Sequence, residues 1–463
     1  MKSSPSHLLW IFSSLVLCFA ASCRTVEQPA PATAPPAATS HTTEAFRLRD
    51  ISNLSDDEFI DMVQRDSTLL YVDKAHPVSG LIAEDGYIAH VGSNGFGLMA
   101  LCIAAERNWI PREDAAQRVA RILHTFLNTG SNHLGALWWI TDAPTATKNP
   151  YGGGFDIVET AYVSAGALVC REYFDRDSTT ERSVRDMANA LYGRVQFDEF
   201  LARDPETGLE GLLWAYDPAK QQFGDLPIVG YHEAMVVYLM ALGSPSHPVP
   251  ASAWSVWTNG YTWVERYGYE YYFCPALFTH QYSLVWMDTR ELQDDATRSR
   301  GITYFENSRR AALSHKAYAE ENPLGHPGYG PIWGLTDCGC PLHPNHFGGH
   351  GLSWPWDIEG DLDDGTVAVS AAGASIMFTP EESIAFLRHV YTVYGEKLYD
   401  RWGFRNAFNV KTGWVDRHHD ALNQGAMVCA IENHRSGLIW KLFMRCPEVQ
   451  EALRKAGFTK RDS

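Results

Sequence analysis

The stretch FDIVETAYVSAGALVCREYF, residues 155–174, places Asp156 and Glu159 at the start of an otherwise apolar helical run. Farther along the chain, GYHEAM, residues 230–235, places Glu233 before a second apolar run. A charge among apolar neighbours costs free energy unless it is paired, and it usually serves a chemical purpose. Both segments therefore predict helices that carry acid and base groups near their first turns.

Helical periodicity recurs along the whole chain, whereas strand signals are sparse. Ser55 to Glu58 has the sequence of a capping box, residues 95–109 form an apolar segment, and Pro111 opens an amphipathic segment that ends at Asn128. Short turns join many of these segments, which is typical of antiparallel helix neighbours. The remaining predicted helices are 156–174, 180–195, 232–242, 252–261, 277–286, 305–321, 366–377, 380–394, 421–443 and 447–456.

About a dozen helices without a sheet suit either a two-layered α/α toroid or a helical solenoid. A solenoid would need a sequence repeat of roughly 30 to 45 residues, and no such repeat is visible. We therefore predict an all-α toroid. In that architecture the loops at one end form a cleft, and the long aromatic- and glycine-rich segments 267–278 and 325–364 are the candidates to form it.

Composition limits the classes of partner. The chain has 463 residues, of which 45% are hydrophobic, so it can bury a sizeable core. Its formal net charge of -17 argues against nucleic acid as a partner and against a basic membrane-binding surface. The aromatic content of 12% suits a protein that stacks on sugar faces, although most aromatic residues in any domain belong to the core.

The N-terminus has the features of an export signal. Lys2 precedes an apolar run, residues 8–21, and small residues stand before Cys23, as in the lipobox of bacterial lipoproteins. We expect a lipoprotein-type signal peptide over residues 1–23 with Cys23 acylated, a Pro/Ala/Thr-rich tether over 24–44, and a single catalytic domain over 45–463. Cleavage nearby or an uncleaved anchor are the alternatives. The expected location is the periplasmic or outer-membrane face.

The cysteines and the acidic loop do not predict a metal site. Seven cysteines follow Cys23, and an odd number is not typical of a disulfide framework. A C-x-C pair with scattered histidines matches no standard zinc spacing, and the acidic stretch after it lacks the order of an EF-hand. We therefore expect a solvated loop, with no metal and no cofactor. The residues concerned are Cys338, Cys340, His343, His346, His350, Asp357, Glu359, Asp361, Asp363 and Asp364.

The spacing of the carboxylates leaves two interpretations open. Asp156 and Glu159 share one helix face with Cβ atoms ~5–6 Å apart, so their repulsion would raise one pKa and leave an acid beside a base. Alternatively, Asp156 is a helix N-cap with Glu159 as its capping-box partner. Glu233 is either a catalyst or a first-turn partner of a helix dipole.

Two further segments suit a sugar-binding surface. FTHQYS, residues 278–283, mixes aromatic rings with hydrogen-bonding groups, as sugar sites do, but it could also be a polar helix start. In YFENSRR, residues 304–310, Glu306 and Arg310 could form an ordinary ion pair between successive turns.

Several motifs in order resemble the glycoamylase-like domain of glycoside hydrolase family 144, the bacterial endo-β-1,2-glucanases. The resemblance spans roughly Ser55 to Phe458. The motifs are DIVETAY (156–162), GYHE (230–233), LGSPSHP (242–248), FTHQYS (278–283), YFENSR (304–309), WGLT (333–336), TPEES (379–383) and IENHRSGL (431–438).

This resemblance implies an (α/α)6 toroid whose cleft accepts a linear β-1,2-glucan and hydrolyses it with inversion. The family's required carboxylates match Asp156, Glu159 and Glu233. Inversion needs an acid and a base ~6.5–9.5 Å apart, so we assign Glu233 as the general acid and either of the other two to water activation or positioning. The predicted substrate-binding residues are His232, Phe278, His280, Gln281, Tyr282, Glu306, Asn307, Arg309, Tyr329 and Trp333.

Two departures from the family pattern bear on the substrate. The family commonly has Asn at the position of His232, and residues 212–217 lack the expected Trp-rich character. The alternatives are an exo-acting hydrolase of sophoro-oligosaccharides, a transglycosylase, a glycan-binding lipoprotein without activity, or a metal-dependent lyase or hydrolase that uses the 338–350 loop. We expect a monomer that takes an oligo- or polysaccharide and touches the membrane through its anchor alone.

Overall fold

The computed structural model describes residues 46–204, 208–224, 227–344, 350–353 and 362–461. The predicted signal peptide, Cys23 and the tether lie outside the described residues, as do His346, Asp357, Glu359 and Asp361. Across the described part of the chain, no helix combines the length and the apolar character needed to cross a membrane.

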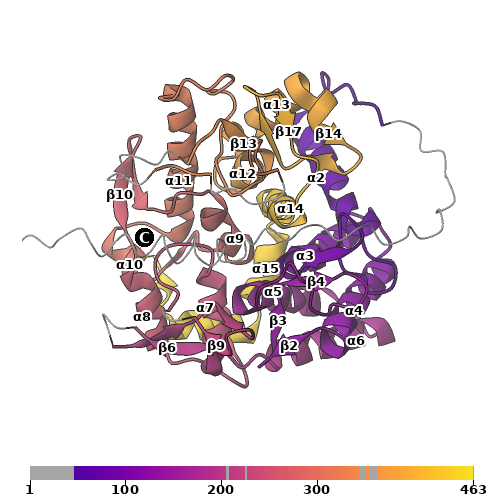
Figure 1. The fold of residues 1–463 in the computed structure, drawn as a ribbon, viewed down its shortest axis with the longest axis vertical. Coiled ribbons are helices and arrows are strands. Elements are labelled where there is room, and N and C mark those ends of the chain that lie inside the picture. Colours follow the sequence, from indigo (N-terminus) through magenta and orange to yellow (C-terminus); the bar gives the residue numbers. More distant parts are fainter. Residues whose placement is uncertain (1–45, 205–207, 225–226, 345–349, 354–361, 462–463) are drawn as a thin grey trace, which may run out of the picture.

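Six helices form the inner layer of a ring (Figure 1). These helices are apolar on nearly every side because they contact neighbours in the ring as well as the outer layer. Every residue of the third and fifth of them is buried. The inner helices are α3 (Val91–Glu106), α5 (Ile157–Tyr173), α7 (Met235–Gly243), α9 (Phe278–Trp286), α12 (Val369–Ala374) and α14 (Ala421–Arg435).

Six amphipathic helices surround this ring and bury one face each. In α6, for example, the buried residues Val184, Ala188 and Leu191 recur at the spacing of one helical face. Inner and outer helices alternate along the chain, which confirms the predicted all-α, (α/α)6 toroid for the described residues. The outer helices are α2 (Asp56–Asp73), α4 (Arg112–Asn128), α6 (Thr179–Gly193), α8 (Ser252–Asn259), α11 (Tyr304–Glu321) and α13 (Pro380–Leu398).

Two glycines let the inner helices α3 and α5 touch through their backbones. A Cβ atom on Gly95 would lie 2.5 Å from the carbonyl oxygen of Tyr162, and one on Gly166 would lie 2.3 Å from the carbonyl oxygen of Gly95. Any side chain at either position would therefore push the helices apart.

The last predicted helices differ from the observed ones in their boundaries. The segment predicted as one helix over 421–443 is broken at Gly437, whose φ of 67° ends the first part. A second helix, α15 (Leu438–Met444), follows, and α16 (Pro447–Lys455) confirms the prediction for 447–456. The predicted helix over 366–377 begins instead with a strand. A short helix that was not predicted, α10 (Asp295–Ser299), precedes α11.

The loops contain strands of two to four residues, too short for a period of two to be recognised in the sequence. Five of them form a sheet in the order β2-β3-β5-β8-β9: β2 (Asn132–His133), β3 (Ala136–Trp138), β5 (Phe155–Asp156), β8 (Ala215–Asp217) and β9 (Gln222–Phe223). In this sheet Asp156 pairs with Leu137 on one side and with Ala215 on the other. The sheet therefore fixes the entry to α5.

The remaining strands form two-stranded antiparallel pairs and one three-stranded sheet, β13-β16-β17. They are β1 (Ile88–His90), β4 (Ile140–Asp142), β6 (Leu201–Arg203), β7 (Glu210–Leu212), β10 (Trp263–Arg266), β11 (Tyr269–Tyr272), β12 (Leu292–Gln293), β13 (Thr366–Ala368), β14 (Tyr399–Asp400), β15 (Gly403–Phe404), β16 (Ala407–Asn409), β17 (Trp414–Val415) and β18 (Thr459–Lys460), with 3-10 turns at Phe197–Phe200 and Ser375–Met377.

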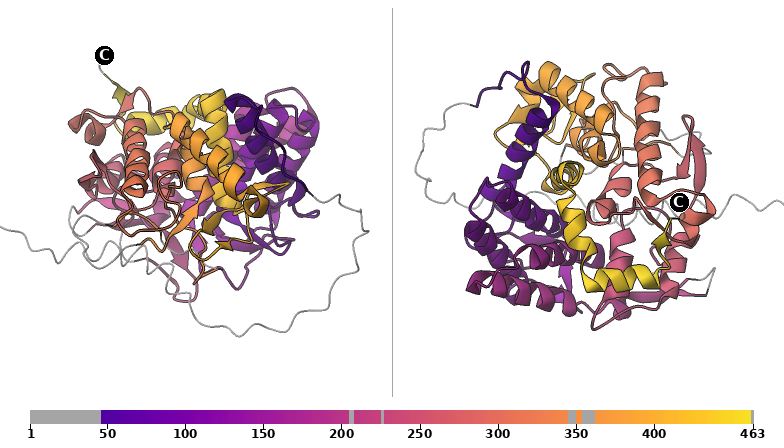
Figure 2. Two further views of the ribbon diagram at one scale, coloured as in Figure 1. Left: turned by 90° about the horizontal axis from the view of Figure 1, so that it is seen from above. Right: turned by 180° about the vertical axis from the view of Figure 1, so that it is seen from behind.

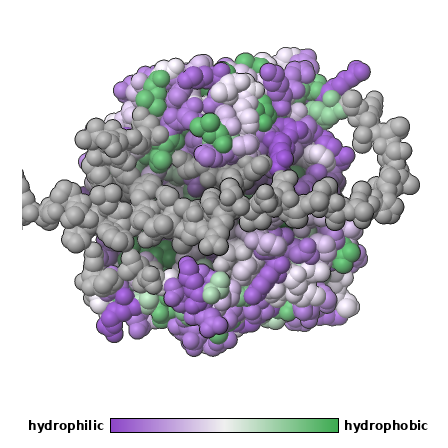
Figure 3. All heavy atoms as spheres, viewed as in Figure 1, coloured by the Kyte–Doolittle hydropathy of each residue, from purple (hydrophilic) through white to green (hydrophobic). Residues whose placement is uncertain are grey.

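The two ends of the ring are built differently, as the views in Figure 2 show. Helices α15 and α16 cover the end where the inner helices finish: Trp440 donates a hydrogen bond to the carbonyl of Leu284 in α9, and Gly243 at the end of α7 packs against the backbone of Glu448. On the face seen in Figure 3 the described surface is mostly hydrophilic, with hydrophobic residues in small separate groups.

Candidate active site

The inner helices all begin at the same end of the ring. Four of them have an ionisable residue just before their first turn. His90 precedes α3, Asp156 precedes α5, Glu233 stands two residues before α7, and Asp420 precedes α14. Helix N-termini carry partial positive charge and favour anions, so this end of the ring can hold several carboxylates together.

Asp156 is the N-cap of α5, which confirms the capping interpretation for this residue. Its Oδ1 accepts hydrogen bonds from the backbone N–H groups of Val158 (2.7 Å) and Glu159 (2.9 Å), and its Oδ2 accepts one from Nε1 of Trp214 (2.8 Å). Burial, and then the charge of Glu159, raise the pKa of Asp156 to about 7. The same carboxyl group therefore caps a helix and can exchange a proton near neutral pH.

Glu159 is not the capping-box partner of Asp156, because its side chain points to α3 instead. Its Oε2 accepts a hydrogen bond from the backbone N–H of Gly92 (2.5 Å) and lies 3.1 Å from Nδ1 of His90. Burial alone would lower the pKa of His90, but the charge and hydrogen bond of Glu159 outweigh it and raise that pKa. Glu159 and His90 thus form a partly buried ion pair. The sequence reasoning had not singled out His90.

Glu233 lies in the turn before α7, where it is 6% exposed. Its Oε2 receives no hydrogen bond from the described residues. The Nδ1 atom of His232 lies 3.6 Å away but accepts a hydrogen bond from the backbone N–H of Ala234, so it has no proton to donate to Glu233. A buried carboxylate oxygen without a partner is costly, and such an oxygen is available to a bound molecule.

Asp337 is a further carboxylate, within electrostatic reach of Glu233, that the sequence reasoning did not identify. Burial, and then the charge of Glu233, raise the pKa of Asp337 to about 7. Asp337 directly follows the WGLT motif. This position was the one sequence feature that could have pointed to Asp337 as a site residue.

Asp420 is the N-cap of α14 and was also missed by the sequence reasoning. Its φ of 58° is unusual for a residue with a side chain, and such strain is concentrated at functional sites. The side-chain amides of Asn406 and Asn423 donate to its Oδ2. Burial, followed by the charges of Glu84 and Asp416, raises its pKa to about 7.

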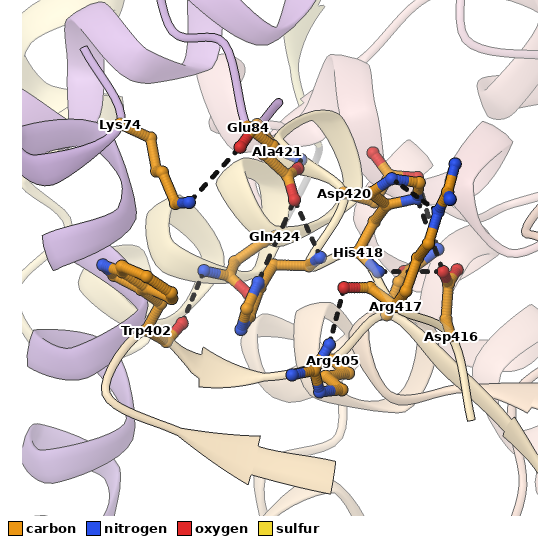
Figure 4. Close-up of polar contacts among 12 residues, drawn as sticks. Lys74, Glu84, Trp402, Arg405, Asp416, Arg417, His418, Asp420, Ala421 and Gln424 are labelled. Atoms are coloured by element: carbon orange, nitrogen blue, oxygen red, sulfur yellow. Dashed lines mark hydrogen bonds and ion pairs between the residues drawn. The ribbon is translucent and has the colours of Figure 1, made fainter. Parts of the chain in front are cut away.

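Glu84 holds the backbone on both sides of Asp420 (Figure 4). Its carboxylate accepts hydrogen bonds from the backbone N–H groups of His419 (2.9 Å) and Ala421 (2.8 Å). Glu84 therefore fixes the strained turn that presents Asp420.

Tyr282 lies within electrostatic reach of four of these carboxylates. Burial raises its pKa well above the usual range, and the charges of Asp420, Glu159, Glu233 and Asp337 add to the shift. Four carboxylates from separate parts of the chain thus lie within electrostatic reach of one phenol group. We call Asp156, Glu159, Glu233, Asp337 and Asp420 the carboxylate ring.

Three predicted binding residues lie at or beside this ring. The hydroxyl of Tyr282 donates to Oδ1 of Asn423 (2.6 Å), and the ring of Phe278 packs on Tyr282 with 5.1 Å between centroids. His232 stands next to Glu233, with its ring 6.0 Å from that of Trp214. The structure therefore brings His232, Phe278 and Tyr282 together with the predicted carboxylates.

Two predicted binding residues on α9 connect parts of the fold. Nε2 of Gln281 donates to the carbonyl of Ala371 in α12 (2.6 Å). Nε2 of His280 lies 3.2 Å from the carbonyl of Cys274, and burial lowers the pKa of His280 to about 3. His280 is thus neutral at physiological pH.

The other five predicted binding residues make contacts within the framework. On the outer helix α11, Glu306 pairs with both Arg309 and Arg310, and Asn307 bonds to the backbone of Tyr272. The remaining contacts are those of Trp333 with Phe386 and of Tyr329 with the carboxylate of Asp363.

Comparison with known proteins agrees with the fold. A family model described as "Putative glucoamylase" matches residues 225–447. A crystal structure with the same description, from Bacteroides uniformis, shares 31% identity and a TM-score of 0.79, and the match covers 88% of this chain and 99% of that one. The chain belongs to the glycoamylase-like family. This membership confirms the resemblance found in the sequence.

Two further relatives have names that describe an activity. One is an endo-β-1,2-glucanase from Chitinophaga pinensis, solved with sophorotriose and glucose, at 29% identity and a TM-score of 0.79, covering 88% of this chain and 99% of that one. The other is an exo β-1,2-glucooligosaccharide sophorohydrolase from Parabacteroides distasonis, 29% identical over 440 residues. That match covers 87% of this chain and 58% of the relative, so the chain spans little more than half of that protein.

Proposed function

We propose that this chain is a glycoside hydrolase that cleaves β-1,2-glucans or related β-glucosides, within the chain of the glucan and with inversion. The observation that carries the proposal is the carboxylate ring, in which three members have a pKa of about 7 and a fourth, Glu233, has a free buried oxygen. Groups that exchange protons near neutral pH are those that general acid–base catalysis needs. The activities of the two named relatives support the same substrate class.

Glu233 is the proposed general acid. Its unpartnered Oε2 can hold a proton toward a glycosidic oxygen, whereas Asp156 and Glu159 are engaged in hydrogen bonds to the protein. These bonds support a positioning role for Asp156 and Glu159. The water-activating base is then one of Asp337 and Asp420, whose pKa values of about 7 suit a base at neutral pH.

A substrate with a good leaving group separates these roles. A dinitrophenyl β-sophoroside releases its aryl group as a stable phenolate that needs no proton from an acid. Glu233→Gln should therefore keep most of its rate on this compound and lose it on linear β-1,2-glucan. Replacing the base with Asn, in Asp337→Asn or Asp420→Asn, should lower the rate on both substrates. Equal losses of Glu233→Gln on the two substrates would contradict its role as the acid.

The second candidate is an exo-acting hydrolase, favoured by the activity for which the Parabacteroides relative is named. Chromatography of the products from linear β-1,2-glucan distinguishes the two. A ladder of oligosaccharides from the first minutes supports internal cleavage, and a single disaccharide supports exo action. If the chain binds this glucan or other β-glucans but forms no product from them, it is a glycan-binding protein without activity.

We also propose that the chain is exported and anchored through an acylated Cys23. The support is the order of Lys2, the apolar run 8–21 and the small residues before Cys23. Labelled palmitate should be incorporated into the wild-type chain and not into Cys23→Ala. Retention of the label in that variant would contradict the proposal.

A further inference from the structure

A cluster of metal-ligand side chains lies between α11 and α12, outside the carboxylate ring. Ligand atoms of Cys340, His350 and Asp364 all lie within 4.8 Å of one another. Cys340 and His350 are buried, and Asp364 is partly exposed. Three separate segments thus bring a thiol, an imidazole and a carboxylate to one point.

The two edges of the His350 ring have different neighbours. Nε2 lies 3.2 Å from Oδ1 of Asp364, and Nδ1 lies 3.6 Å from Sγ of the fully buried Cys338. A metal-binding histidine usually binds through one nitrogen and donates the N–H of the other to an acceptor that fixes the ring. In His350 the Nε2 edge faces Asp364, and Nδ1–H can donate to the sulfur of Cys338.

We propose that Cys340, His350 and Asp364 bind a zinc ion, and that Cys338 holds the His350 ring in place. Zinc takes thiolate, imidazole and carboxylate ligands at about 2.0–2.3 Å, so tetrahedral ligand atoms stand about 3.3–3.8 Å apart. Shifts of an ångström or less bring the three groups to this separation. A water molecule takes the fourth position, and the Cys340 thiol releases its proton to solvent on binding.

The choice of metal follows from the ligands. Calcium and magnesium require several oxygen ligands, and this cluster offers one carboxylate beside a sulfur and a nitrogen. A soft thiolate with an imidazole favours zinc. The C-x-C spacing could not reveal the site, because His350 and Asp364 join it from ten and twenty-four residues beyond Cys340.

The ion would fasten the chain segment that carries part of the carboxylate ring. Asp337 directly precedes Cys338, and the charge of Glu233 acts on Asp337. The proposal goes beyond the proposed hydrolysis, and it is tested without any glucan, so either can fail alone.

Titration of the purified full chain with Zn²⁺ and with Co²⁺, after reduction with a metal-free phosphine, tests the site. We expect about one zinc per chain. Cobalt should give thiolate-to-metal charge-transfer absorption and the visible bands of a tetrahedral ion. Zinc should raise Tm by several degrees, and EDTA should reverse the shift. A wild-type chain that binds no zinc overturns the proposal.

Variants assign the ligands. Cys340→Ser should abolish the cobalt–thiolate absorption, and Asp364→Asn should weaken zinc binding at least ~10-fold. Cys338→Ser should weaken zinc binding but keep the cobalt–thiolate absorption, because the ligand sulfur belongs to Cys340. If Cys340→Ser and Asp364→Asn bind zinc like the wild type, the proposal is wrong.

Two matched controls should bind zinc normally. Cys446→Ser changes another buried thiol, before α16, and Asp50→Asn changes a carboxylate that accepts a backbone N–H two residues on, as Asp364 does. A disulfide between Cys338 and Cys340 that survives reduction would also overturn the proposal.

Discussion

Glu233 is buried, and its Oε2 has no hydrogen-bond partner among the described residues, so this oxygen is free to contact a substrate. Replacing Glu233 with Gln keeps the shape of the side chain and removes the proton that the proposed acid would donate. We expect Glu233→Gln to lower turnover of linear β-1,2-glucan by about 10²–10⁴-fold and to leave Tm nearly unchanged, because Oε2 has no described partner to lose. Initial rates and thermal melts measure both. Glu320→Gln, which changes an exposed carboxylate on α11 that pairs with Lys316, is the control and should keep its rate. Normal turnover of Glu233→Gln would refute the assignment.

Asp337 makes the stability of the protein depend on pH. Its pKa rises from an ordinary 3.8 to about 7 on folding, so the folded state prefers the neutral carboxyl. Below about pH 4 this preference does not affect the free energy of unfolding. Above about pH 7 it lowers that free energy by its full amount, on the order of a few kcal/mol. Asp337→Asn, which stays neutral, should therefore gain Tm relative to the wild type as the pH rises from 4 to 8.

Melting curves of the wild type and Asp337→Asn across this pH range test the expectation. Asp295→Asn, which changes a carboxylate whose side chain is 97% exposed, should show no such trend. A Tm difference between Asp337→Asn and the wild type that does not vary with pH would show that the buried carboxyl is ionised without penalty.

The sequence identified part of the candidate site at the residue scale. Asp156, Glu159 and Glu233 drew attention because a charge stands out in an apolar helical pattern, and the family resemblance assigned them to catalysis. Glu84, His90, Asp337 and Asp420 lie before helices or in loops without periodicity, where a polar residue is ordinary. These residues become part of the candidate site only when the fold brings distant segments of the chain together.

At the scale of the helix, Asp156 serves α5 as well as the site, and two substitutions separate these roles. Asn caps a helix about as well as Asp, so Asp156→Asn should lower turnover and keep the cap. Asp156→Ala removes the charge and the Trp214 acceptor as Asp156→Asn does, so it should lower turnover and be about 1–2 kcal/mol less stable than Asp156→Asn because the cap is lost. Rates and denaturant unfolding of both variants are the measurement. Equal stability of the two variants would mean that the cap does not stabilise α5.

Helices were the most predictable elements, because apolar or amphipathic periodicity and capping residues mark them. The capping box at Ser55 and the start of α4 after Pro111 were located to within a residue. The break at Gly437 was missed, because the apolar pattern continues across it. The strands were missed because two to four residues cannot show alternation.

One buried carboxylate on the last inner helix links this helix to the first two helices of the ring. Glu432 on α14 is fully buried and accepts hydrogen bonds from Arg107 at the end of α3 and from Gln64 on α2. The first and last described parts of the toroid therefore meet at this residue. The order of the helices predicted a ring, but the residues that join its ends could not be identified without the fold.

Glu432→Gln should weaken this closure. The amide keeps the shape but loses the charge opposite Arg107, so we expect a loss of about 1–3 kcal/mol of unfolding free energy. Denaturant unfolding provides the measurement. Glu451→Gln, which removes an exposed ion pair with Arg454, is the control and should change stability by less than about 1 kcal/mol. A similar small change in Glu432→Gln would mean that the ring closes without this contact.

The position of α16 and β18 has a practical consequence for handling the protein. α16 packs against the finishing end of α7, and β18 pairs with β12, which follows the end of α9 (Figure 2). The last described strand, β18, therefore lies on the side of the toroid opposite to the carboxylate ring. Immobilising the chain on a resin through a C-terminal tag, or fusing a reporter there, should leave the reactive end facing the solution and accessible to a polymer.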